Sequence, residues 1–165
     1  MSKSIVLIGP MGAGKTTLGK RLAKTLKLAF TDTDKLISRK HGSIPDIFTN
    51  KGEAHFRQLE SAALEQALET GGVIATGGGI VLSEANRALL KGQRVIFLDT
   101  TMDYVLKSLN TEKRPLLKQD PANWQVIYDQ RLPLYRECAS ATVRTDNRPV
   151  DTILQELERE ADKNV

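Results

Sequence analysis

The chain has 165 residues, 40% of them hydrophobic and 27% charged, which is typical of one soluble globular domain with a substantial core. No apolar run is long enough to span a membrane, and the single cysteine, Cys138, excludes an intramolecular disulfide. The formal net charge of +4 is mildly basic, but the basic residues form no dense block. We therefore expect a cytoplasmic monomer that binds neither nucleic acid nor a membrane, with a pocket for a small anion.

Short apolar runs alternate with helical patterns along the chain. The run at 5–8 is followed by leucines one turn apart at 18, 22 and 26, which indicate a helix from Thr16. Further strand-like runs lie at 29–31, 73–76, 95–98 and 141–144, and an amphipathic helix follows Pro149. Such alternation predicts parallel strands joined by right-handed crossovers and covered on both faces. We expect an α/β fold, a three-layer α/β/α sandwich with a five-stranded parallel sheet, as one domain over residues 1–165.

Two segments interrupt the alternation. Residues 33–68 are mostly helical and long for a single crossover, and residues 110–122 are polar, basic and proline-bearing. We interpret both as excursions above the edge of the sheet where folds of this type bind ligands. For the second segment, the alternative is a solvated basic loop.

The sequence GPMGAGKT at 9–16 matches the phosphate-binding pattern G-x-x-x-x-G-K-[ST] in full, between a strand and a helix. The glycines let the backbone curl so that N–H groups face an anion, and the helix N-terminus adds its positive dipole end. Lys15 would neutralise the β- and γ-phosphates, and the Thr16 hydroxyl would bind Mg²⁺. The alternative is a glycine-rich turn with no ligand. The residues expected to hold the nucleotide phosphates are Gly12, Ala13, Gly14, Lys15, Thr16 and Thr17.

The base of the nucleotide is predicted to be adenine. A GTPase carries an Asn-Lys-x-Asp motif after a late strand, whereas the Asn50-Lys51 pair of this chain lies early and follows no strand. The late strand instead leads to Arg148-Pro149, and an arginine can stack on the face of a base. We therefore expect Arg148 to contact the base of ATP.

Asp32 and Asp34 end the second strand-like run and open the helical segment after it. Two carboxylates this close cannot both lie in a core without partners, and at this end of a strand they face the ligand crevice. Asp32 would hold Mg²⁺ through a water, and Asp34 would accept the proton of a substrate hydroxyl. The alternative is that either aspartate only caps the next helix.

Seven motifs together closely resemble the shikimate kinase family, from the first strand to the final helix. In chain order they are the phosphate loop, DTD at 32–34, FR at 56–57, GGG at 77–79, RPLL at 114–117, RLPLY at 131–135 and RP at 148–149. The resemblance implies a P-loop kinase fold like that of the nucleoside monophosphate kinases. It also implies transfer of the ATP γ-phosphoryl group to the 3-hydroxyl of shikimate, on the route to chorismate and the aromatic amino acids.

The resemblance also implies roles for individual residues. Arg57 and Arg131 would bind the shikimate carboxylate, for which bidentate arginines are suited. Gly77, Gly78 and Gly79 would let the substrate ring approach the bare backbone. A substrate-binding excursion would cover about 33–61, and a lid at about 110–122 would bring Arg114 to the phosphates. The implied catalytic residues are Lys15, Asp34 and Arg114, and one Mg²⁺ would be held by Thr16 and Asp32.

Blander interpretations of the same residues stay open. Glu53 or Glu60 could simply pair with Arg57 along a helix, and Pro133 should kink or end the helix that carries Arg131. The triple glycine fits a tight turn, and Leu82 stands where a dinucleotide fingerprint has its last glycine. For the whole chain, the alternatives are another small-molecule kinase of this fold, such as a gluconate kinase, or a regulatory nucleotide-binding module without transfer activity.

Overall fold

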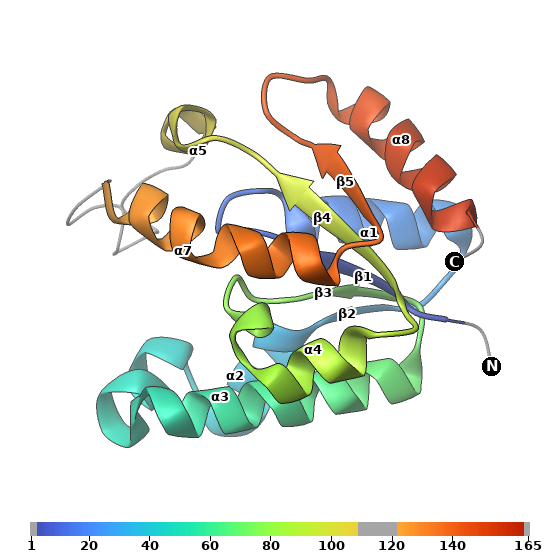
Figure 1. Cartoon of the computed structure of the whole chain (residues 1–165). Helices are drawn as coiled ribbons and strands as arrows, with labels where there is room; N and C mark the ends of the chain where they lie inside the picture. Colours follow the sequence, from blue (N-terminus) through green and yellow to red (C-terminus); the bar gives the residue numbers. More distant parts are fainter. Residues whose placement is uncertain (1–2, 109–121, 164–165) are drawn as a thin grey trace.

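A computed structural model describes residues 3–108 and 122–163 of the chain (Figure 1). Its described residues form a five-stranded, wholly parallel sheet in the order β2-β3-β1-β4-β5, which confirms the predicted fold class. The expected strand-like runs lie within one residue of each observed boundary. The strands are β1 (Ile5–Ile8), β2 (Phe30–Asp32), β3 (Val73–Ala75), β4 (Arg94–Asp99) and β5 (Ala141–Arg144).

Helices connect the strands and cover both faces of the sheet. They are α1 (Lys15–Leu26), α2 (Thr33–His41), α3 (Ile44–Thr70), the 3₁₀ turn η1 (Ile80–Leu82), α4 (Glu84–Leu90), α5 (Met102–Ser108), α7 (Ala122–Cys138) and α8 (Val150–Asp162). Figure 1 shows α1 and α8 on one side of the sheet and α3, α4 and α7 on the other. Within the described residues, no helix combines the length and apolar character needed to cross a membrane.

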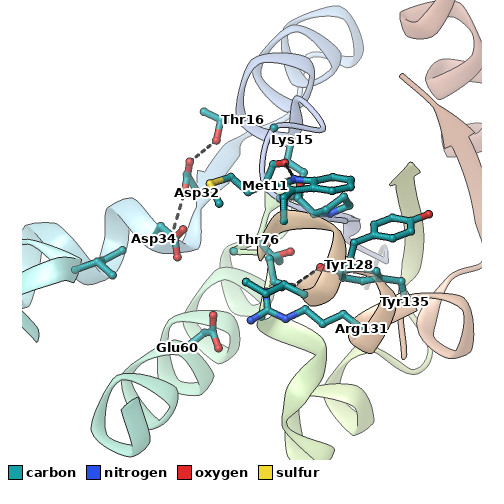
Figure 2. A pocket seen from close by; sticks show the side chains of 18 of the residues that line it. Met11, Lys15, Thr16, Asp32, Asp34, Glu60, Thr76, Tyr128, Arg131 and Tyr135 are labelled. Carbon is teal, nitrogen blue, oxygen red and sulfur yellow. Dashed lines mark hydrogen bonds between the residues drawn. The ribbon is translucent and has the colours of Figure 1, made fainter. Parts of the chain in front are cut away.

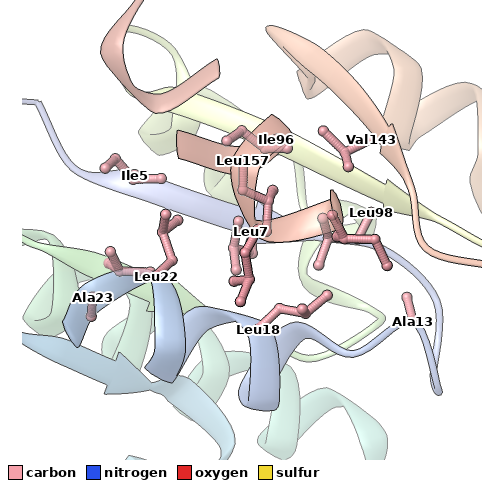
Figure 3. Close-up of a cluster of buried hydrophobic side chains, with 13 residues drawn as sticks. Ile5, Leu7, Ala13, Leu18, Leu22, Ala23, Ile96, Leu98, Val143 and Leu157 are labelled. Atoms are coloured by element: carbon pink, nitrogen blue, oxygen red, sulfur yellow. The ribbon is translucent and has the colours of Figure 1, made fainter. Parts of the chain in front are cut away.

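Each face of the sheet has its own hydrophobic core. On one face, side chains of α1 and α8 pack against alternate residues of β1, including Leu7, with Leu22 and Leu157 fully buried (Figure 3). On the other face, residues of α3, α4 and α7 pack against Val6 and Ile8. Burial on both faces explains why β1 reads as a continuous apolar run.

The strand order places the polar strand ends side by side. β1 is the central strand. The strands that follow it first, β2 and β3, lie on one side of it, and the later strands, β4 and β5, lie on the other side, so the strand order reverses at β1. The phosphate loop follows β1, the glycines 77–79 follow β3, and Asp32 ends β2. Such a switch point, outside the carboxyl ends of the strands, is where open α/β sheets bind ligands.

The expected excursion at about 33–61 corresponds to α2 and the first part of α3, which share a small core of Ile37, Ile47, Phe56 and Ala63. Gly52 breaks α3 with a φ of 85°, so the helix turns there. The expected lid at 110–122, with Arg114, lies outside the described residues except for Ala122, the first residue of α7. Pro133 does not end its helix, since α7 continues to Cys138 and proline removes only one backbone donor.

Candidate active site

A cavity of about 510 Å³ opens at the carboxyl edge of the sheet. Its walls are the phosphate loop, the start of α2, the middle of α3, the glycines after β3 and one face of α7 (Figure 2). The structure therefore brings the sequence-predicted residues Lys15, Thr16, Asp32, Asp34, Arg57, Gly77, Gly78, Gly79 and Arg131 to one cavity. Its size suits a small ligand.

The phosphate loop has the backbone that its glycines predict. Gly12 and Gly14 have φ values of 88° and 97°, a region that other residues rarely adopt, and α1 begins directly afterwards at Lys15. The Lys15 ammonium donates hydrogen bonds to the carbonyl oxygens of Gly9 and Pro10, the latter at 3.0 Å. This arrangement presents a helix N-terminus and a lysine to an anion in the cavity.

The two carboxylate oxygens of Asp32 accept three hydrogen bonds. The Thr16 hydroxyl donates a hydrogen bond of 2.7 Å to Asp32 Oδ2, and Asp32 Oδ1 accepts from the backbone N–H groups of Asp34 and Lys35. Asp32 therefore is the N-cap of α2, as the blander interpretation proposed, and also faces the phosphate loop.

The side chains expected to hold Mg²⁺, Thr16 and Asp32, have the chemistry that this ion requires. Both supply the hard oxygen atoms that Mg²⁺ prefers, and this ion usually keeps several waters and phosphate oxygens as further ligands. No group of three or more His, Cys, Asp or Glu side chains that could hold a metal occurs in residues 3–108 and 122–163. The residues present thus fit Mg²⁺ carried with a nucleotide better than a metal held by the protein alone.

Asp34 lies in the first turn of α2, half-buried in the cavity wall (Figure 2). Its Oδ1 is buried without a hydrogen-bond partner in the part of the chain that the structure describes. Burial raises the pKa of Asp34 above its usual value, as does the nearby Asp32 charge, while Lys15 and Arg57 oppose the shift. A carboxylate in this position is more basic than an exposed one and has an unused acceptor oxygen.

Arg57 is held by two carboxylates of its own helix. Its guanidinium makes an ion pair of 3.0 Å with Glu60, which is 1% exposed, and a longer one of 3.7 Å with the exposed Glu53. Desolvation raises the pKa of Glu60, while the Arg57 charge and hydrogen bond oppose that shift. Both pairs that the sequence allowed are therefore present, and Arg57 still lines the cavity.

The three glycines after β3 each lie against a different charged side chain. A β-carbon on Gly77 would come within 2.8 Å of Asp34 Oδ1, and one on Gly78 within 3.3 Å of an Arg131 guanidinium nitrogen. A β-carbon on Gly79 would collide with the Arg57 guanidinium, within 2.8 Å of its Nη2. The turn also continues into the 3₁₀ helix η1, so it is both a tight turn and a close-packed cavity wall.

Helix α7 contributes contacts that the sequence did not reveal. The buried Tyr135 donates a hydrogen bond of 2.6 Å to the Gly78 carbonyl oxygen, and desolvation raises its pKa to about 12. Trp124 donates one of 2.8 Å to the carbonyl oxygen of Met11 in the phosphate loop, and Tyr128 donates one of 2.7 Å to Asp99. These partners are far apart in the chain, so no local pattern could have found them.

Of the described residues, Ala13 and Arg148 were predicted to bind the nucleotide but do not line this cavity; Ala13 is buried in the hydrophobic core beside α1. Arg114 lies outside the described residues. Arg148 follows β5, where it makes an ion pair of 2.6 Å with Glu156 and donates to the Arg144 carbonyl oxygen at 2.8 Å. Its expected contact with the base stays a prediction.

The fold and site define a P-loop kinase that acts on a small molecule, and the comparisons name the family. The shikimate kinase family model matches residues 11–161, so the chain belongs to the shikimate kinase family. This confirms the resemblance seen in the sequence motifs and the expected ATP-dependent kinase.

Relatives and solved structures agree with this assignment. The chain is 45% identical over 161 residues to a shikimate kinase from Pseudomonas paraeruginosa, covering 93% of each chain. It is 42% identical to one from Rhodococcus erythropolis, covering 95% of this chain and 96% of that one. A shikimate kinase from Acinetobacter baumannii, solved in complex with shikimate, superposes with a TM-score of 0.86 at 37% identity, over 94% of this chain and 90% of that one.

Proposed function

We propose that the chain transfers the γ-phosphoryl group of ATP to the 3-hydroxyl of shikimate, giving shikimate 3-phosphate and ADP. The observation that carries this proposal is the joint placement of Asp34, Arg57 and Arg131 around the bare glycine turn, opposite the phosphate loop. A phosphate loop alone suits many kinases, but this acceptor wall suits a small ring with both a carboxylate and hydroxyls. Family membership favours shikimate over the gluconate that the sequence left open.

On the acceptor side, Arg57 and Arg131 bind the carboxylate of shikimate. Two guanidinium groups offer bidentate, permanently charged donors, and Glu60 fixes the orientation of Arg57 by an ion pair of 3.0 Å. Gly77, Gly78 and Gly79 let the ring lie close to the backbone. Asp34 then receives the hydroxyl proton as the oxygen attacks the γ-phosphorus and the bond to the ADP oxygen breaks.

On the nucleotide side, the loop residues 12–17 hold the phosphates of ATP, and Lys15 neutralises the charge that develops in the transition state. Thr16 and Asp32 would hold one Mg²⁺, which would supply positive charge that offsets the negative charge of the phosphates. Arg114 joins the phosphates from the proposed lid at about 110–122, and Arg148 contacts the base. Catalysis is then mainly positioning and charge neutralisation.

We further propose that the protein is a cytoplasmic monomer, a single domain whose partners are ATP and shikimate and which binds no nucleic acid. Analytical ultracentrifugation at micromolar protein concentration, with and without ligands, tests whether the protein is monomeric by measuring its molecular mass.

The deciding experiment measures ADP release by the purified protein with ATP and Mg²⁺, in the presence and absence of shikimate. We expect shikimate to stimulate ADP release strongly and gluconate at equal concentration to leave it at the background rate. Stimulation by gluconate and not by shikimate would overturn the assignment of shikimate as the substrate. Tight ATP binding with no transfer to either acid would instead favour the regulatory module.

A further inference from the structure

One polar contact in the cavity wall belongs to a residue that the proposed reaction does not use. The indole N–H of Trp124, on α7, donates a hydrogen bond of 2.8 Å to the carbonyl oxygen of Met11, across 113 residues of sequence. Trp124 is the only tryptophan of the chain and is 4% exposed. A buried aromatic donor aimed at the backbone of a ligand-binding loop points to a role in the shape of that loop.

The contacted carbonyl belongs to the peptide between Met11 and Gly12. This peptide is trans, as are all described peptides, so its C=O and N–H groups point in opposite directions. With the carbonyl oxygen held by Trp124, the Gly12 N–H faces away from the indole. The orientation of one potential phosphate donor is thus set by a side chain from a different helix.

The loop's own covalent structure does not fix this orientation. Gly12 has a φ of 88°, and glycine tolerates both signs of φ, so the Met11–Gly12 peptide is free to turn over unless something holds it. A turned peptide would direct a carbonyl oxygen, rather than an N–H, to the place where the phosphates bind. The neighbouring carbonyl oxygens of Gly9 and Pro10 already accept from Lys15.

The indole itself is held firmly in place. Its ring stacks on Tyr128, with 5.1 Å between centroids and 11° between planes, and it packs with Val105 and Met102 of α5. Tyr128 in turn donates to Asp99, the last residue of β4, at 2.7 Å. The donor is therefore tied to the central sheet through Tyr128, independently of the loop that it contacts.

We propose that Trp124 is a positioning residue for the nucleotide: its indole N–H holds the Met11–Gly12 peptide in the orientation that binds phosphate. This inference rests on the proposed function only in that the loop binds a nucleotide. Trp124 contacts Met11 and not the acceptor wall, so it governs the affinity for nucleotide and not that for shikimate.

The test compares two changes at residue 124 in the full-length protein. Trp124→Phe keeps an aromatic ring against Tyr128 and removes the donor. Replacing Trp124 with 3-benzothienylalanine keeps the shape of the indole and puts sulfur where the N–H was, so it controls for packing. Calorimetry measures the affinities for ADP and for shikimate separately, and thermal melting checks that each variant is folded.

We expect both changes to weaken ADP binding about five- to tenfold, the effect of losing one buried hydrogen bond, with shikimate affinity within about twofold of the parent. Tyr135→Phe is the matched control, because it removes one hydroxyl from the same helix but at the acceptor wall, and it should leave ADP affinity within about twofold.

The outcomes separate this inference from the proposed function. If the unchanged protein binds ADP and the benzothienylalanine protein binds it equally well, the role of Trp124 is wrong while the proposed function stands. If Tyr135→Phe lost as much ADP affinity as the two changes at residue 124, the cause would be a general loosening of α7. That result would also overturn the role of Trp124. If the unchanged protein binds no ADP, both proposals fail.

Discussion

The carboxylate of Asp34 lies so close to the α-carbon of Gly77 that a β-carbon there would come within 2.8 Å of Asp34 Oδ1. Gly77→Ala should therefore displace Asp34 by a few tenths of an ångström or more, because the short carboxylate side chain can move and the sheet behind it cannot. We expect kcat to fall about 10²-fold, as for other small misplacements of a reacting group, with Tm almost unchanged. Steady-state kinetics and thermal melting check this.

Gly79→Ala provides the contrast, because its new methyl group would meet the Arg57 guanidinium instead of Asp34. Here we expect the KM for shikimate to rise about tenfold or more, with the KM for ATP unchanged. If the two alanine variants changed the same kinetic constant, the separate roles given to Asp34 and Arg57 would be wrong.

The pH dependence of the rate should report the environment of Asp34. Burial and the Asp32 charge raise its pKa, so the carboxylate form that accepts the proton is lost at a higher pH than for an exposed aspartate. We expect the rate to fall as the pH decreases through this raised pKa. Because the pKa of Glu60 is also raised, Glu60→Gln is the control, and the acid limb should persist in it.

The same shift has the opposite effect on stability. The folded protein holds the Asp34 proton more tightly than the unfolded chain, whose carboxyl has a pKa near 3.8, so the free energy of unfolding falls as the pH rises through the folded-state pKa. Asp34→Asn should therefore have a higher Tm than the parent at pH 7, with the gain vanishing below about pH 3.8. It should also lose kcat about 10²–10⁴-fold. A lower Tm at pH 7 would contradict the assigned desolvation.

Arg57→Ala should raise the KM for shikimate about 10²-fold while ADP affinity stays within about twofold, because a charge-assisted bidentate contact to a carboxylate is lost. It also leaves the buried Glu60 without its 3.0 Å partner, so a lower Tm is expected. Glu53→Gln is the matched control. That side chain is 61% exposed and 3.7 Å from Arg57, so the KM for shikimate should not change. Loss of ADP binding in Arg57→Ala would refute the acceptor role.

Asp32 combines helix capping with a proposed place near Mg²⁺, and one substitution separates the two. Asp32→Asn keeps a side-chain oxygen for the N–H groups of Asp34 and Lys35 but removes the negative charge. We expect a Tm close to that of the parent and a severalfold higher Mg²⁺ concentration for half-maximal rate. Asp32→Ala should lose about 1 kcal/mol of stability as well. An unchanged Mg²⁺ requirement in Asp32→Asn would contradict the metal role.

The sequence predicted the three inner strands well because β1, β3 and β4 are buried on both faces, so their apolar runs are continuous and short. The edge strands β2 and β5 are only partly buried. The phosphate loop was also predictable, because its tight backbone requires positive φ angles, and the glycines that adopt them recur at a fixed spacing in the sequence. Asp34 was predicted from its place after a strand beside the phosphate loop, with helix capping as the alternative. Arg57 was predicted through the ordered motifs, with pairing along a helix as the alternative. The structure shows that Asp32 caps α2 and also accepts a hydrogen bond from Thr16, and that Arg57 pairs with Glu60 and also lines the cavity.

What the sequence could not predict are contacts made across the fold. Glu60 was considered only as a partner of Arg57, and its near-complete burial follows from the packing of α3 against α2. The hydrogen bond from Tyr135 to Gly78 spans a sequence separation of 57 positions, and the one from Trp124 to Met11 spans 113. Each depends on where α7 lies relative to the sheet, which no spacing within α7 encodes.

The glycine turn has a consequence for inhibitor design. Gly77, Gly78 and Gly79 offer a ligand bare backbone, and a side chain at any of these positions would press on Asp34, Arg131 or Arg57. A compound that gains its affinity from this stretch of main chain therefore meets a surface with few routes to resistance. Substitutions that shield the backbone from the compound would also disturb the side chains proposed to bind shikimate and accept its proton.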